Sequence, residues 1–498
     1  MTFDAWVPVL AVLSSLVPGL VIFALAEERT VTRTVLNLAG VGSKVGLVAL
    51  MFWGVAYERR YEFRMPVLPE IDFVLRADAL GLLFAALSAV LWLLTTIYAI
   101  AYLEGSPHRS RFFGFFSLCV SATMGIALAG NLFSFVIFYE LLTLSTYPLV
   151  VHRGSEAALR AGRTYLRYTL AGGAVLLLAS VWLFSLVGPI EFDEGASLAR
   201  LGEQSGGTLV VIFALLIAGL GVKAALVPLH GWLPVAMVAP APVSALLHAV
   251  AVVKAGAFGI VRVVYDVYGI RFSETLGVTT PLAIVAAFTV VYGSVRALFQ
   301  DDLKRRLAYS TVSQVSYVVL GVAVIGPSAT LGGVLHLVHQ GVMKITLFFC
   351  AGNLAETLGL HRISEMNGVG RRMPWTMTAF TVAAFGMIGV PPVAGFVSKW
   401  YLGVGAVEAG QPWVLGVLAL STVLNAAYFL PVLHAAWFRA PGGPWPEEHA
   451  FGRLETHWAL LMPPLVTACL ALGMGLLAGM PFSPLQWVRL IVERAYEP

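Results

Sequence analysis

Long apolar runs separated by short polar stretches make up most of the chain. Runs of roughly 18 to 25 residues are long enough for an α-helix to cross the hydrocarbon core of a bilayer. The alternating pattern of a membrane β-barrel does not occur. The sequence therefore predicts an all-α polytopic membrane protein with about fourteen transmembrane helices. We expect these spans at residues 4–26, 33–57, 76–103, 112–130, 131–151, 162–187, 209–229, 239–266, 278–300, 304–325, 329–355, 374–405, 413–438 and 458–480.

The two ends of the chain carry different signals. The first apolar run, from Trp6, has no basic residue before it and no small-residue cleavage pattern after it, so it is expected to be a retained span. Residues 483–495 (SPLQWVRLIVERA) mix apolar and charged positions and predict an amphipathic helix lying in the membrane interface.

Composition supports a membrane protein without a cofactor of its own. Hydrophobic residues make up 59% of the chain and charged residues 12%, whereas a soluble domain carries about 25% charged residues. The cysteines Cys119, Cys350 and Cys469 are isolated, and there is no phosphate-binding or dinucleotide fingerprint. We therefore expect no metal and no cofactor. We also expect no nucleic-acid partner, because most basic residues lie at membrane boundaries.

The basic residues predict an orientation. Loops that follow odd-numbered spans hold roughly fifteen Lys and Arg, against about six in the loops that follow even-numbered spans. The positive-inside rule then makes the odd loops cytoplasmic and places both termini outside. The acidic loop 188–208 falls outside, which agrees with this orientation.

Two predicted spans contain helix-breaking residues: Gly219, Gly221 and Pro228 in span 7, and Gly386, Gly389, Pro391 and Pro392 in span 12. Such breaks are tolerated in a membrane only where the freed backbone groups line protein or a cavity. The two spans run in opposite directions, which predicts inverted five-helix repeats made of spans 4–8 and 9–13. The expected regions are spans 1–3 in 1–110, the first repeat in 111–266, the second in 267–440, and span 14 with the interfacial helix in 441–498.

Five charged residues stand inside apolar runs: Glu140, Lys223, Lys254, Lys344 and Lys399. Each costs roughly 2.5–3.5 kcal/mol at the centre of a span. They can persist only if they face the protein interior, pair with one another, contact water or stay neutral. This pattern is typical of a proton or ion path.

Lys223 stands at the break of span 7, and Glu140 is its candidate partner. Burial favours a neutral lysine and a nearby carboxylate favours a charged one, so a small movement of Glu140 would switch Lys223 between holding and releasing a proton. The alternative is a static ion pair that fixes helix packing. A packing role alone does not account for the lysines further along the chain.

The remaining single candidates have different expectations. His248 lies six positions before Lys254 and on another face of the helix, so it either lines the path or packs against a neighbour. Lys399, after the break of span 12, is the expected terminal proton donor. Lys44 also lies within an apolar run and looks buried; it either reaches the interface or meets a partner subunit, and we assign it no role.

Span 11 carries a polar stripe. His336, Gln340 and Lys344 recur every four residues and share one helix face, with His339 close to it. Such a stripe can hold water and pass protons, because histidine titrates near neutral pH. The same side chains could instead bond the backbone groups that neighbouring broken helices leave free.

Three segments carry a resemblance to a known family. The run VKAALVPLHGWLPVAMVAPAPVSALLHAVAVVKAG resembles the core signature of antiporter-like membrane subunits, which occur in respiratory complex I, membrane-bound hydrogenases and Mrp cation/proton antiporters. FVIFYELLTLSTYPLV and MIGVPPVAGFVSKWYL are similar to two more of the family's segments. The resemblance covers roughly residues 75–405 and implies fourteen spans with inverted five-helix repeats.

The resemblance also implies a proton-path role for eight residues. They are Glu140 in span 5, Lys223 in span 7, His248 and Lys254 in span 8, His336, His339 and Lys344 in span 11, and Lys399 in span 12. Some members carry a second histidine where this chain has Gln340. Because glutamine does not titrate, a relay at that point would run through water or a neighbouring histidine.

The chain length and the lysine in span 12 resemble the D-type subunit of an Mrp antiporter. The resemblance implies a proton-translocating subunit of an Na⁺/H⁺ antiporter, in a bacterial or archaeal cytoplasmic membrane, with partner subunits of types A, B, C, E, F and G or their equivalents. It implies no chemistry of its own beyond moving H⁺. Few acidic residues lie in the spans, so Na⁺ is expected to bind mainly in another subunit.

Three alternatives stay open, because the segment GRTYLRYTLAGGAV departs from the Asn-containing segment expected of the D-type subunit. The chain could be the proton-pumping subunit of a redox-driven complex, either NADH:quinone oxidoreductase-like or a hydrogenase. It could serve an inorganic-carbon uptake complex. It could also be a scaffold with an inactive path.

Overall fold

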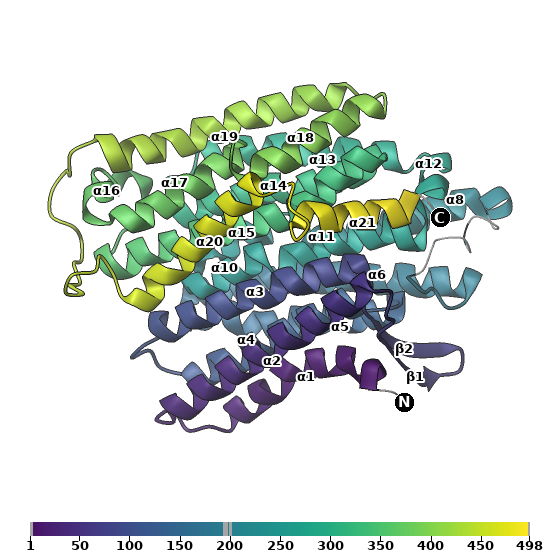
Figure 1. The fold of residues 1–498 in the computed structure, drawn as a ribbon, viewed down its shortest axis with the longest axis horizontal. Helices are drawn as coiled ribbons and strands as arrows, with labels where there is room; N and C mark the ends of the chain where they lie inside the picture. The colour runs from purple at the N-terminus through teal and green to yellow at the C-terminus, as the bar shows by residue number, and fades with distance from the viewer. Residues whose placement is uncertain (1–2, 193–197, 199–201, 497–498) are drawn as a thin grey trace.

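The protein is a bundle of long helices that lie side by side, with α1 and α2 at one edge and α19 at the opposite edge (Figure 1). The computed structural model describes residues 3–192, 198 and 202–496. The first helices are α1 (Phe3–Phe23), α2 (Thr30–Ala56), α3 (Ala79–Tyr102), α4 (Arg109–Leu128), α5 (Leu132–Val150), α6 (Glu156–Val187) and α8 (Gly202–Lys223).

The second part of the chain includes the three most buried spans, which are the segment 241–267, α14 and α15. Its helices are α9 (Trp232–Val235), α10 (Ala241–Ala249), α11 (Val252–Arg262), α12 (Ile270–Thr275), α13 (Thr279–Leu298), α14 (Leu303–Val324) and α15 (Pro327–Leu358). The 3₁₀ turn η1 (Ala236–Val238) precedes α10, and the π-helical turn η2 (Val263–Val267) continues α11.

The last part begins with the 3₁₀ turn η3 (Ile363–Glu365) and the short α16 (Val369–Arg372). The remaining helices are α17 (Pro374–Ile388), α18 (Ala394–Glu408), α19 (Trp413–Phe438), α20 (Trp458–Leu476) and α21 (Pro484–Tyr496).

The predicted spans are present. Within the described residues, 13 helical segments are long and apolar enough to cross a membrane, and α17 is a shorter apolar helix that α18 continues after a break. The expected tail helix forms as α21. Part of the acidic loop between α6 and α8, residues 193–197 and 199–201, lies outside the described residues.

Polar residues set the starts of several helices. Asp78, Asn131, Ser155 and Asp302 are the N-caps of α3, α5, α6 and α14. Each side chain accepts a hydrogen bond from the backbone N–H three residues later, at 2.6, 2.8, 3.2 and 2.8 Å. Capping satisfies a donor that has no partner within the helix, which fixes where each span begins.

A β-hairpin joins α2 to α3 and was not predicted from the sequence. Strand β1 (Glu62–Leu68) pairs antiparallel with β2 (Ile71–Arg76). Leu75, within β2, also pairs with Ala129, and Asn131 pairs with Glu191, through isolated β-bridges. The hairpin and the two bridged segments therefore form a small cap over the start of α5. We call this end of the bundle the hairpin face.

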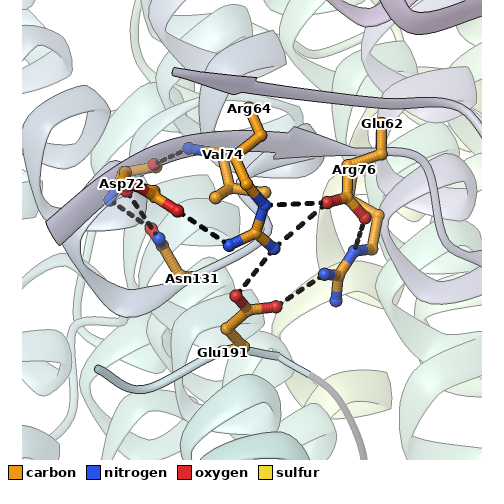
Figure 2. A network of polar contacts seen from close by, with 8 residues as sticks. Glu62, Arg64, Asp72, Val74, Arg76, Asn131 and Glu191 are labelled. Atoms are coloured by element: carbon orange, nitrogen blue, oxygen red, sulfur yellow. Dashed lines mark hydrogen bonds and ion pairs between the residues drawn. The ribbon is translucent and has the colours of Figure 1, made fainter. Parts of the chain in front are cut away.

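A cluster of charges holds the cap together (Figure 2). Arg64 contacts Glu62 at 3.1 Å, Asp72 at 2.9 Å and Glu191 at 2.7 Å. Arg76 contacts Glu62 at 2.8 Å and Glu191 at 2.7 Å. Each arginine therefore links the hairpin to Glu191, in the segment that follows α6. These contacts hold that segment against the cap at the start of α5.

The opposite end of the bundle, which we call the basic face, holds the starts of α2, α4, α6 and α14 and most of the loop arginines. Between the two faces, burial is uneven. The apolar windows of α15 and of the segment 241–267 are 100% buried, whereas that of α6 is 28% buried. Polar residues on the central helices are therefore shielded from the lipid.

Three spans are interrupted at mid-length. Helix α8 ends at Lys223, and the chain resumes a helix at Trp232. Helices α17 and α18 are separated by residues 389–393, as the proline pair predicted. A third interruption, at Val250 and Ala251 between α10 and α11, has no proline or glycine to signal it.

Candidate functional site

Lys223 is the last residue of α8 and is fully buried. Its Nζ donates a hydrogen bond to the Tyr139 backbone oxygen and lies 3.3 Å from the centroid of the Tyr139 ring. Trp232 closes the break from the other side, because its indole N–H donates to the Val222 oxygen at 2.7 Å. The amino group is thus held against α5, one residue from Glu140.

Glu140 lies close to Lys223 without forming an ion pair with it at 4.0 Å or less in the described structure. The two charges interact across the gap. The Oε1 atom of Glu140 is buried and has no hydrogen-bond partner among the described residues. The carboxylate instead lies against α6, where a Cβ built on Gly173 would stand 2.1 Å from Oε1. The predicted partners are therefore neighbours, and no hydrogen bond or ion pair joins them in the described structure.

Lys254 lies in the first turn of α11, directly after the unpredicted break. It is fully buried, and its Nζ has no hydrogen-bond partner among the described residues. His248 precedes the break at the end of α10, stacked on Phe348 with ring centroids 4.6 Å apart. Both of its ring nitrogens also lack a described partner. An unpaired buried amine and an unpaired imidazole are costly unless water or a mobile proton reaches them.

His336 is the most completely bonded residue of the α15 stripe. Its Nδ1 is 2.8 Å from Ser398 Oγ, and its Nε2 is 3.1 Å from Gln314 Oε1. Ser398 Oγ is also within 3.2 Å of the Gly395 oxygen. With Gln314 accepting, His336 is doubly protonated when Ser398 donates to Gly395, and singly protonated when Ser398 donates to Nδ1. One hydroxyl rotation therefore accompanies the gain or loss of a proton.

Lys344 begins a chain of hydroxyl groups toward α19. Its Nζ donates to Ser310 Oγ at 2.8 Å, and Ser310 Oγ is 2.8 Å from the Tyr428 hydroxyl. Tyr428 in turn donates to the side-chain oxygen of Asn425. Ser310 and Tyr428 were not predicted from the sequence. The hydroxyl-rich run YSTVSQVSY within an otherwise apolar span was the available signal.

Lys399 lies in α18, just past the break. Its Nζ donates to the Met387 and Ile388 oxygens at 2.8 and 2.9 Å, which are the last carbonyls of α17. It also stands 5.2 Å from the centroid of the Tyr317 ring. These carbonyls have no partner within α17, so the lysine holds the two half-helices together. Its side chain is only partly buried, unlike those of the other three lysines of the path.

The titratable residues in the second half of the predicted path lie within electrostatic range of one another. His336 lies close enough to Lys254, Lys344 and Lys399 to interact with the charge of each. Lys344 interacts in turn with Lys254, and His248 with Lys344. The structure therefore brings these residues together in one interior region.

Unpartnered polar atoms continue along the same interior. Besides the groups already described, those of the second half among the described residues are His339 Nδ1, both polar side-chain atoms of Gln340, Gln314 Nε2, the Tyr317 hydroxyl and Asn353 Oδ1. Buried polar atoms of this kind are ordinarily satisfied by bound water. Bound water would join the lysines and histidines, which are too far apart to bond directly.

Residues 129–425 match the family described as NADH:quinone oxidoreductase/Mrp antiporter, TM. The chain belongs to this family. It is 37% identical over 422 residues to NADH-quinone oxidoreductase subunit N of Desulforudis audaxviator (strain MP104C), with 82% of each chain covered. It is 28% identical over 428 residues to the D-type subunit of the Na(+)/H(+) antiporter of Bacillus subtilis (strain 168), with 85% of this chain and 83% of the relative covered.

A solved structure shows the same fold. A chain in the structure of the Mrp complex from Dietzia sp. DQ12-45-1b superposes with a TM-score of 0.87 at 22% sequence identity, covering 100% of this chain and 98% of the other. The family resemblance predicted from the sequence is confirmed. This protein is an antiporter-like membrane subunit of the Mrp and complex I family.

Proposed function

We propose that this antiporter-like subunit moves protons across the membrane through Glu140, Lys223, His248, Lys254, His336, His339, Lys344 and Lys399. The observation that carries the proposal is the set of titratable groups that lie buried or half-buried on the helices from α5 to α18, several of them with polar atoms that have no partner among the described residues. One elementary charge crossing 100 mV exchanges about 2.3 kcal/mol with the membrane potential, so such a path can drive or be driven by another ion or redox step.

Two of the three interrupted spans, those that break after α8 and after α17, support an arrangement in inverted repeats. In this proposal α4 to α11 form one repeat and α13 to α19 the other, and each of these two breaks has a lysine beside it. The long helices α6 and α15, each of 32 residues, occupy the same position in the two repeats. Each half then presents one lysine that bonds backbone oxygens near a break.

A cavity supports an entrance at the basic face, which we assign to the cytoplasm from its arginines and lysines. It has a volume of about 160 Å³ and is lined by residues that include Tyr102, Arg153 and Lys304. Lys304 Nζ donates to the Ala239 oxygen at 2.7 Å and is 3.4 Å from Ser244 Oγ. Ser244 precedes His248 by four residues, on the same face of α10.

Two kinds of parent complex remain candidates, each with its own support. The likeness to the D-type subunit of a Na(+)/H(+) antiporter supports an Mrp-type Na⁺/H⁺ antiporter. The higher identity to NADH-quinone oxidoreductase subunit N favours a redox-driven complex, in which electron transfer occurs in partner chains. Mass spectrometry of the co-purifying subunits separates the two. Small cation-antiporter subunits support the first, and quinone-site or redox-centre subunits support the second.

The transport proposal is tested by Lys223→Ala in the assembled complex, reconstituted in proteoliposomes. Removing an amine that carries the proton is expected to lower proton flux on the order of a hundred-fold. Arg160→Ala is the matched control, because Arg160 pairs with Glu156 on an exposed surface and loses the same charge. Wild-type flux in an assembled Lys223→Ala complex would overturn the proposal.

A further inference from the structure

Lys44 is buried in the N-terminal helices, away from the proposed path. It is fully buried within α2, so it does not reach the interface or an outer partner as the sequence suggested. Its Nζ donates to Ser15 Oγ on α1 at 2.5 Å and stands 4.5 Å from the centroid of the Trp92 ring on α3. No ion pair joins it to a carboxylate of the described residues. A buried amine with only a hydroxyl and an aromatic ring beside it needs a further explanation.

Two polar stripes lead from the basic face toward Lys44. One lies on α2, at Arg33 and Asn37, and the other on α4, at Ser110 and Ser117. Arg33 Nη1 donates to Ser110 Oγ at 2.8 Å, and Ser117 Oγ donates to Asn37 Oδ1 at 3.5 Å. Lys44 follows Asn37 after seven residues, which is two helical turns, so it lies on the same face of α2. The contacts form the first two rungs of a ladder between the helices.

The third rung reaches Lys44 itself. Ser121, four residues after Ser117, donates to the Val12 oxygen at 3.0 Å. Ser15, which accepts from Lys44, donates to the same oxygen at 3.5 Å. Ser121 of the α4 stripe and Ser15, which accepts from Lys44, therefore both donate to one backbone carbonyl of α1.

The ladder covers half of the membrane and ends there. Arg33 and Lys44 are separated by about 16 Å along α2 at 1.5 Å per residue, roughly half of the 30 Å hydrocarbon core. Past Lys44, the buried face of α2 continues with Val48, Met51 and Val55, which are apolar. The polar contacts, which we call the lane, thus run from Lys44 toward the basic face, and the buried side chains of α2 on the hairpin side of Lys44 are apolar.

Several donors along the lane have no partner among the described residues. Asn37 Nδ2 lies beside the second rung, and Trp92 Nε1 and Thr96 Oγ1 lie four residues apart on α3, from the level of Lys44 toward the basic face. All three residues are at most 1% exposed. Water can accept from these donors and also donate to neighbouring oxygens, so their burial points to bound water along the lane.

We propose that this lane is a hydrated half-channel through which Lys44 exchanges protons with the basic face. A hydrated proton entering the lane adds to the lone pair of Nζ and leaves by the reverse step, so no other reactant is consumed. The charged groups at the mouth are Arg33, Arg109 and Glu27, with Glu27 accepting from two backbone N–H groups at the start of α4. Hydration of the lane does not depend on the proposed function. A contribution of Lys44 to proton transport does rest on the proposed function.

Cysteine labelling in membrane vesicles tests the hydration. Lys44→Cys and Val48→Cys are made in the assembled complex with Cys469, the exposed native cysteine, replaced by Ser. A small, positively charged, membrane-impermeant methanethiosulfonate is added to one face at a time. Lys44→Cys is expected to react from the basic face only, on the order of ten-fold faster than Val48→Cys one turn deeper.

A third variant keeps the labelling decisive. Ser117→Cys, at the second rung, is expected to react from the basic face, and its reaction would show that the reagent can enter the lane. Reaction of Ser117→Cys without reaction of Lys44→Cys would mean that the lane is dry at its end, and the proposal fails. Reaction of Lys44→Cys from the hairpin face would also contradict it.

Solid-state NMR of ¹⁵N-lysine tests the proton exchange directly. The Nζ signal that disappears in Lys44→Met belongs to Lys44. It is expected to change between the ammonium and amine positions as the buffer is taken from acid to alkaline. A signal that stays fixed and does not exchange with water overturns the proposal. The same signal seen beside an active Lys223→Ala variant would reject the proposed path and leave the half-channel intact.

Discussion

Two of the three interrupted spans, those that break after α8 and after α17, each place a lysine against backbone carbonyls, in different surroundings. Lys223 ends its half-helix and reaches a carbonyl of another span, the Tyr139 oxygen, with Glu140 next along α5. Lys399 lies past its break and returns to the carbonyls at the end of α17, within the same span. The first is fully buried, and the second is partly exposed.

The difference lies in the counter-charge. Glu140 lies close enough to Lys223 to interact with its charge, so movement of α5 against α8 changes the proton affinity of the lysine. In the described structure Lys399 has backbone oxygens, an aromatic ring and His336 close to it, but no carboxylate pairs with it. We infer that the first break is suited to switching and the second to handing a proton onward.

The sharpest way to break this comparison is to replace Lys399 with residues that keep different properties. Lys399→Met loses both carbonyl bonds, each worth about 1 kcal/mol, and is expected to lower the melting temperature and the proton flux. Lys399→Arg keeps donors for the carbonyls but holds its proton, so flux should fall on the order of a hundred-fold with stability retained. Proteoliposome flux and thermal unfolding measure the two effects. An active Lys399→Arg complex would show that Lys399 is only structural.

Gly173 offers a smaller perturbation of the first break. A Cβ at this position would lie 2.1 Å from Glu140 Oε1, so Gly173→Ala must push the carboxylate aside. The carboxylate ends a flexible chain, so we expect normal assembly and a two- to five-fold loss of flux, equivalent to about 0.5–1 kcal/mol. Gly42→Ala is the matched control, because no atom lies within 4 Å of its added Cβ. Equal flux in the two variants would remove the switching role of Glu140.

The charge cluster of the hairpin should give the smallest effect (Figure 2). Burial alone would raise the pKa of Glu191, but hydrogen bonds from Arg76 and Arg64 outweigh it and hold the pKa below its usual range. The stabilisation is therefore present above the unfolded pKa of about 4.3 and is lost as pH falls through the folded value.

Glu191→Gln tests this cluster by thermal unfolding of the complex. The variant is expected to be less stable at neutral pH by up to about 1 kcal/mol, because the pairs are partly solvated. The difference from wild type should shrink in acid, where Glu191 is protonated. A difference that grows in acid would mean that the cluster does not stabilise the cap over α5.

The sequence was sufficient for those features that local chemistry decides. Apolar runs placed the spans, and the proline pair after α17 placed its break, because proline cannot continue a helix. The break before Lys254 has no such residue, so it could not be read from the chain. The hairpin was missed because its strands are short and lie between longer apolar runs.

The contacts of the site depended on packing between distant segments. Ser15 and Lys44 are 29 residues apart, and Lys344 and Ser310 are 34 apart. Residue type identified the lysines as unusual, but only the fold shows which hydroxyls and carbonyls they meet. For the same reason, the sequence could not show that Glu140 and Lys223 are neighbours without an ion pair at 4.0 Å or less.

The central claim, that protons pass between the two interrupted spans, is tested most directly at Lys254. Its amino group bonds to nothing among the described residues, so Lys254→Met removes no hydrogen bond and should leave assembly and thermal stability unchanged or improved. Proton flux through the reconstituted complex is then the single readout. The path predicts a loss on the order of a hundred-fold. Wild-type flux in a stable Lys254→Met complex would contradict it.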